Sequence, residues 1–154
     1  METEQSPEIR KLRYAQAADA LEKYLELTPN AEEKQTWLEQ LESLRHYLFL
    51  RRNDGSERTV FSGREVTTKP RVLRKPVPSY TEGARGNKIS GTVVLRVIFG
   101  ADGTIKHFLV VKGLPYGLTE AAIRAARGIK FIPATINGRP VSMFIQLEYN
   151  FYLF

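Results

Sequence analysis

Few residues of this 154-residue chain have the types and spacing that catalysis or metal binding requires. The chain has no cysteine, which excludes thiolate nucleophiles, disulfides and cysteine-ligated metals. Its two histidines, His46 and His107, lie far apart in the sequence. The loop at residues 113–117 contains glycines but lacks the Lys-Ser/Thr ending of a phosphate-binding loop. We therefore expect no catalytic residues, no metal site and no cofactor, and we expect that the protein is not an enzyme.

Near the end of the chain, backbone hydrogen bonding could take the place of side-chain chemistry. Residues 141–154 alternate there between apolar and more polar side chains. Alternation with a period of two is typical of a strand with one face on the core and one on water. If this strand lies at the edge of its sheet, its unpaired N–H and C=O groups can bind an extended segment of a partner. The candidate partner-binding residues are Val141, Ser142, Met143, Phe144, Ile145, Gln146, Leu147, Glu148, Tyr149, Asn150 and Phe151.

The orientation and pairing of this strand decide whether an edge is available. With the odd-numbered positions on the core, the exposed alternates are Ser142, Phe144, Gln146, Glu148 and Asn150. Two other arrangements compete with this one: the strand lies in the centre of its sheet, or it pairs with a second copy of the chain in an intertwined homodimer. Either arrangement would leave no free edge for a partner.

Cations gather in a second region, between residues 69 and 78, where they alternate with prolines. Lys69, Arg71, Arg74 and Lys75 could contact the phosphates of a nucleic acid or an anionic lipid surface. The favoured interpretation is an extended, solvated spacer, because proline stiffens a chain and charge keeps it soluble. No aromatic residues alternate with these cations, as they do in proteins that bind single strands, so a nucleic-acid partner is not expected.

Two helices are predicted before these regions. Ser6 suits the N-cap and Pro7 the first helical position, and apolar residues at helical spacing continue to about Leu27. Pro29 breaks this pattern, and a second apolar stripe runs to about Leu50. Because the break is short, we expect an antiparallel helical hairpin.

The rest of the chain alternates helices and strands. The predicted elements are a helix at 79–86, strands at 91–99 and 105–111, a helix at 120–127 and a strand at 141–154. Asp102-Gly103 and Asn137-Gly138 are turn signals, and Thr119 is a candidate N-cap. The predicted fold class is α+β: an α-helical hairpin followed by a domain with a three-stranded antiparallel sheet and two helices.

The net charge changes sign between the helical part of the chain and the α+β part. Residues 1–65 carry a net charge of −3, and residues 66–154 carry +9. Such a shift is typical of modules that have different partners. We predict a helical hairpin at 1–50, a basic linker at 51–78 and an α+β domain at 79–154. No run approaches the ~18 consecutive apolar residues of a membrane span, so none is expected in this chain.

Short motifs follow one another in order across residues 66–154. They are Pro78-Ser79-Tyr80, Ala84-Arg85, Gly91-Thr92-Val93-Val94-Leu95, Ala101-Asp102-Gly103, Ala121-Ala122-Ile123, Lys130-Phe131-Ile132-Pro133-Ala134, Asn137-Gly138-Arg139-Pro140-Val141 and Tyr149-Asn150-Phe151. In this order they resemble the C-terminal domain of TonB-family energy transducers. Thr81 departs from the family, which often has proline at this position.

The resemblance implies a periplasmic protein-interaction domain. Such a domain would capture the TonB box of an outer-membrane transporter as an added strand and use the proton-motive force to open the transporter. It would be driven by an inner-membrane proton-channel motor through a segment not in this chain, so we expect an anchor or signal segment upstream. The alternative is an envelope scaffold or dimerisation module without force transduction.

The N-terminal helices are similar to part of a tetratricopeptide repeat. Tyr14, Ala17, Leu21, Leu25 and Pro29 follow the spacing of a repeat's second helix. Repeat arrays need roughly three or more units to bury their apolar faces. We therefore expect these helices to belong to a longer array and the chain to be a fragment.

Overall fold

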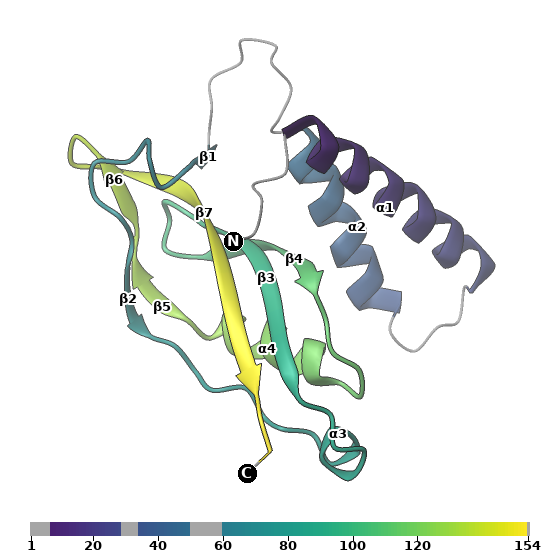
Figure 1. The fold of residues 1–154 in the computed structure, drawn as a ribbon. Coiled ribbons are helices and arrows are strands. Elements are labelled where there is room, and N and C mark those ends of the chain that lie inside the picture. The colour runs from purple at the N-terminus through teal and green to yellow at the C-terminus, as the bar shows by residue number, and fades with distance from the viewer. Residues whose placement is uncertain (1–6, 29–33, 50–59, 154) are drawn as a thin grey trace. The chain divides into compact units, whose positions relative to one another are not determined.

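A computed structural model describes residues 7–28, 34–49 and 60–153. The chain divides into two compact units, Met1–Arg58 and Thr59–Phe154. The division falls inside the predicted linker, so most of that linker, residues 59–78, belongs to the C-terminal unit. Figure 1 shows the helices of the first unit and the sheets of the second.

The first unit is the predicted helical hairpin. Helix α1 spans Pro7–Leu27 and helix α2 spans Lys34–Phe49. Edge-on ring contacts join Tyr24 to Trp37 and Tyr14 to Tyr47, an order that only antiparallel helices allow. The predicted cap Ser6 lies outside the described residues. The helix pair is confirmed, whereas its likeness to a tetratricopeptide repeat stays a prediction.

The second unit is built around one long strand pair. Strand β3 (Gly91–Phe99) runs antiparallel to β7 (Arg139–Phe151), and the register is continuous from Gly91↔Phe151 to Phe99↔Met143. Strand β4 (Ile105–Lys112) pairs with the other side of β3. These are the three predicted strands, except that β7 ends three residues before the predicted end at residue 154.

The prediction of a three-stranded antiparallel sheet is wrong, because short strands extend it. Strand β1 (Val60–Phe61) pairs with β7 in parallel, so the sheet order is β1-β7-β3-β4 and the sheet is mixed. Strand β6 (Ala134–Ile136) pairs with the start of β7 across the turn at Asn137-Gly138. A strand of three residues, such as β6, is too short to show an alternating pattern, which explains why the sequence did not reveal it.

The basic linker contains a further strand. Strand β2 (Arg71–Arg74) runs antiparallel to β5 (Lys130–Ile132) in a separate two-stranded sheet. The cations of the linker are therefore held by backbone pairing to the region just after the second predicted helix. In Figure 1, β2 and β5 lie side by side below β6.

The core of the unit lies between β3 and helix α4 (Leu118–Arg127). Alternate residues of β3 are almost fully buried: Val93, Leu95, Val97 and Phe99. Burying each such side chain stabilises the fold by roughly 1.5–3 kcal/mol. The facing side of α4 is rich in alanine, and such small side chains let the helix approach the sheet closely. Helix α3 (Glu82–Gly86) is the short predicted helix, and the Thr81 side chain caps it by accepting from the Ala84 N–H at 3.2 Å.

Thr119 does not cap α4, contrary to the prediction. The helix begins at Leu118 after Gly117, whose φ of 79° is left-handed and favours glycine. The Thr119 hydroxyl instead accepts from the Leu114 N–H at 2.8 Å and donates to the Leu114 carbonyl at 2.9 Å. Its role is to hold the loop that precedes the helix. The predicted end of this helix at Gly128 is confirmed.

Candidate functional site

The two sides of β7 differ in how they are paired. One side hydrogen-bonds to β3 over all nine residues of that strand. On the opposite side, β1 pairs with Ser142 and Met143. Beyond Met143, no other strand within the described ranges pairs with this side. We call residues 144–151 on this side the outer edge of β7; Figure 1 shows this strand as a long yellow ribbon.

Side chains of β7 alternate as the sequence predicts. Met143, Leu147, Tyr149 and Phe151 are buried, and they belong to the face that packs on the core. The exposed residues are Gln146, Glu148 and Asn150, and the half-buried ones are Val141, Ser142, Phe144 and Ile145. A strand docked on the outer edge would therefore have polar side chains as neighbours, with Phe144 as an apolar one.

The backbone of β7 presents hydrogen-bonding groups on its outer edge. The Lys75 ammonium donates to the carbonyl of Glu148 at 3.1 Å, which indicates that this carbonyl points away from β3. In an antiparallel pair without register shifts, residues alternate between those that direct both backbone groups to the partner and those that direct both away. Phe144, Gln146 and Asn150 share the parity of Glu148. Their N–H and C=O groups therefore also face outward.

Lys75 is the residue that contacts this edge. Besides its bond to Glu148, its ammonium lies over the ring of Tyr149, 4.6 Å from the ring centroid. Burial raises the pKa of Tyr149 to about 12, and its hydroxyl has no hydrogen-bond partner among the described residues. Lysine is the side chain that most often protects sheet edges, because its charge opposes the approach of another strand. The sequence alone could not reveal this contact, because Lys75 and Glu148 lie 73 residues apart in the chain.

The other cations of the predicted contact linker lie on β2 or just before it. Arg71 and Arg74 are exposed on β2, and Lys69 is exposed just before it. The structure thus separates the four linker cations: Lys75 reaches the outer edge, and the two arginines lie on the small sheet. Whether any of them contacts an anionic partner stays a prediction.

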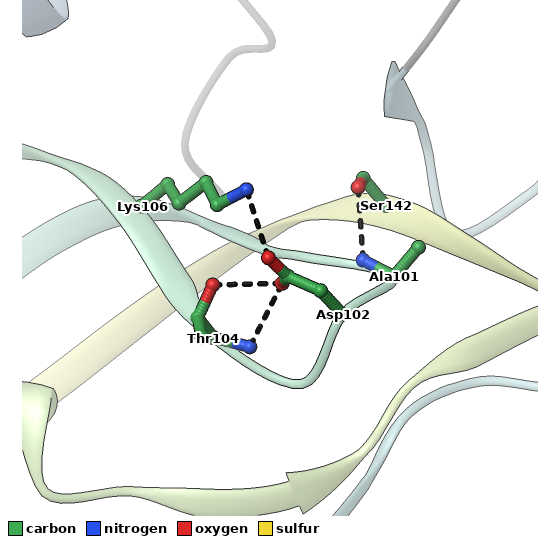
Figure 2. A network of polar contacts seen from close by, with 5 residues as sticks. All are labelled: Ala101, Asp102, Thr104, Lys106 and Ser142. Carbon is green, nitrogen blue, oxygen red and sulfur yellow. Dashed lines mark hydrogen bonds and ion pairs between the residues drawn. The ribbon is translucent and has the colours of Figure 1, made fainter.

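The start of β7 is tied to the turn between β3 and β4. Figure 2 shows the Ala101 N–H donating to the Ser142 hydroxyl at 3.0 Å. In the same turn, Asp102 accepts from the N–H and hydroxyl of Thr104 at 3.0 and 2.7 Å and pairs with Lys106 at 3.1 Å. These bonds, led by that from the Thr104 hydroxyl, lower the pKa of Asp102 to about 2. The Ser142 side chain therefore serves the fold at this end of the strand.

Two other kinds of feature, a metal site and a membrane span, are missing from the described residues. No three histidine, aspartate or glutamate side chains in the described part of the chain gather as a metal site would require. None of the described helices has the length and apolar character needed to cross a membrane. The candidate site in the described residues is therefore the outer edge of β7, a regular strand whose backbone groups face outward there.

The mixed sheet, the helix packed on it and the long last strand, β7, define an α+β domain. The sequence model of the family described as Gram-negative bacterial TonB protein C-terminal matches residues 76–153. The chain belongs to this family, so the predicted resemblance is confirmed over those residues. The family consists of non-enzymatic energy transducers, and its domains lie in the periplasm of Gram-negative bacteria.

Among solved structures, the chain is similar to the C-terminal domain of TonB from Pseudomonas aeruginosa, determined by solution NMR. The two share 21% sequence identity with a TM-score of 0.48, and the match covers 60% of this chain and 93% of that one. A comparison with curated proteins gives no match.

Proposed function

We propose that the C-terminal unit binds the TonB box of outer-membrane transporters as an added strand on the outer edge of β7. In this role, the protein acts in the periplasm and couples the proton-motive force, supplied by an inner-membrane motor, to the opening of the transporter. Membership of the TonB C-terminal family implies transporter partners of this kind. The observation that carries the proposal is the run of outward-facing backbone groups at Gln146, Glu148 and Asn150.

The edge suits a short segment bound with moderate affinity. Each backbone hydrogen bond adds a net ~0.5–1.5 kcal/mol, whereas ordering each residue of a flexible peptide costs about 1–2 kcal/mol. Hydrogen bonds alone therefore bring little net affinity, and contacts of alternate side chains must add to them. Phe144, half-buried beside the edge, provides an apolar contact for such a side chain.

The same edge supports a second candidate function. An uncovered regular edge also pairs with identical edges, so two copies could join through β7 and form an envelope scaffold without force transduction. In that case the edge would already be occupied in solution. The two functions predict different oligomeric states for the free chain.

An amide NMR titration of the full chain with a TonB-box peptide tests the proposal. We expect chemical-shift changes concentrated at residues 144–151, and a peptide of the same composition in scrambled order serves as the control. Sedimentation of the same sample gives the oligomeric state. Changes elsewhere, or none in a folded monomer, would overturn the proposal; none in a dimer whose β7 amides are protected from exchange would replace it with the scaffold.

A further inference from the structure

The small sheet of β2 and β5 brings cations from two parts of the chain onto one face. Arg71 pairs with Ile132, and Arg74 pairs with Lys130. Directly opposite residues lie on the same face of a strand pair, and residues two apart on one strand share a face. These four residues therefore share a face, which we call the ribbon face.

A register shift between β2 and β5 places Arg71 and Arg74 on the same face. Arg71 and Arg74 are three residues apart, and in a regular strand they would point to opposite faces. The register shifts between Val72 and Arg74, so that Leu73 has no directly opposite partner. The extra residue returns Arg74 to the face of Arg71. The result is three cations around one aliphatic side chain.

The ribbon face is turned to solvent, and on the opposite face Phe131 packs into the core while its partner Val72 stays partly exposed. Phe131, between Lys130 and Ile132, is buried, and its ring centroid lies 4.3 Å from that of Phe99. Ile132 keeps 44% of its surface exposed, and Leu73 keeps 59%. Buried phenylalanine on one side thus fixes the direction in which the cations and Ile132 point.

The charge on this face is not neutralised within the described residues. Neither β2 nor β5 contains an acidic residue, and Arg71, Arg74 and Lys130 make no ion pair in the described ranges. Residues 66–154 carry a net charge of +9, so the surrounding potential is positive as well. A complementary partner is therefore an extended anionic surface.

From these observations we propose that the ribbon face binds the surface of an anionic phospholipid bilayer. Cations beside exposed aliphatic side chains suit the headgroup region, where the charges meet lipid phosphates and the aliphatic groups enter the apolar boundary. A nucleic acid strand would favour aromatic side chains for stacking, and the ribbon face has none. The face is separate from the outer edge of β7, so the proposal does not depend on transporter binding.

Co-sedimentation of the full chain with vesicles tests this proposal. We expect binding to vesicles of phosphatidylglycerol and phosphatidylcholine at low salt, and none to phosphatidylcholine alone. Each cation adds roughly fivefold to binding near an anionic surface, so Arg71→Ser/Arg74→Ser/Lys130→Ser should lose on the order of a hundredfold. Ile132→Ser should lose a smaller factor, and added salt should weaken all binding.

A matched control removes three exposed cations elsewhere in the unit. Lys88→Asn/Lys112→Ser/Arg124→Ser changes the net charge equally but leaves the ribbon face intact, and it should retain most of the binding. Equal losses in the two variants would overturn the proposal, because net charge alone would then explain binding. Absence of vesicle binding at low salt would also overturn it, and binding to a DNA duplex in place of vesicles would replace the ligand by a nucleic acid.

A measurement on the unsubstituted chain keeps the proposal testable if the ribbon variant fails to fold. Spin-labelled lipid in the phosphatidylglycerol vesicles broadens the amide signals of residues that lie at the membrane. We expect the strongest broadening at residues 71–74 and 130–132. Broadening confined to other regions would contradict the assignment of the ribbon face.

Discussion

In the sheet of the C-terminal unit, the far side of β4 and the side of β7 beyond β1 are protected in different ways. Strand β4 pairs with β3 through two register shifts, and His107 within it has a φ of 55°. Lys106 and Lys112 add charge to that strand. Strand β7 pairs with β3 without any shift, and its outer edge is contacted by Lys75, a residue from outside the strand.

This difference indicates which edge can accept another chain. A strand with register shifts and a left-handed residue cannot continue a regular ladder, and such a residue costs about 1–3 kcal/mol that the surrounding fold must offset. A regular strand can continue the ladder as soon as its protecting group leaves. The protection of β4 is therefore built into its backbone, whereas the protection of β7 at Glu148 comes from a side chain, Lys75, that can move aside.

The largest expected effect comes from Gln146→Pro. Proline removes the outward N–H and places its ring against an incoming strand, which costs roughly 3 kcal/mol or about a hundredfold in affinity. Calorimetric titration with a TonB-box peptide measures the change. Gln146→Ala, which keeps the N–H, should bind within about twofold of the native chain.

Circular dichroism must show that the Gln146→Pro chain is folded, since a strand tolerates proline only where the N–H of the replaced residue is not bonded to a neighbouring strand. A folded variant with native affinity would contradict docking on the outer edge of β7 and direct attention to β4.

A smaller effect, in the opposite direction, is expected from Lys75→Met. The change keeps the length of the side chain but removes its hydrogen bond to Glu148 and its charge over Tyr149. A docking strand then no longer competes with the ammonium. Such an exposed contact contributes about 0.5–1 kcal/mol, so we expect affinity for the peptide to rise by roughly two- to fivefold.

Lys69→Met is the matched control, because Lys69 is an exposed cation of the same segment that lies before β2, six residues away from Lys75 in the sequence. It should leave the affinity unchanged. Weaker binding by Lys75→Met would instead mean that the ammonium holds the docked strand in place.

Local patterns predicted the long elements but not the contacts that join distant segments. The alternation in residues 141–151 and the helical spacing before Leu27 are each visible within one stretch of sequence. The short strands β2 and β5 carry no such pattern, and they pair with each other although they lie far apart in the chain. The contact of Lys75 with Glu148 is of the same kind. The elements could therefore be predicted, and the partial protection of the edge could not.

Asp102→Asn, which has the smallest expected effect, tests whether the turn between β3 and β4 influences binding at the outer edge of β7. The pKa of Asp102 is lowered from 3.8 to about 2, so its carboxylate stabilises the folded turn above about pH 4, and this contribution is lost as the pH falls towards 2. In thermal unfolding, the stability of the variant should therefore fall less than that of the native chain between about pH 4 and pH 2. At neutral pH its melting temperature should be only slightly lower, because Asp102 is exposed. Peptide affinity should not change, since the outer edge of β7 begins beyond Ser142, the residue that receives the bond from Ala101. Lower affinity in a folded Asp102→Asn chain would show that the turn, through this bond to Ser142, also holds β7 in the form that accepts a strand.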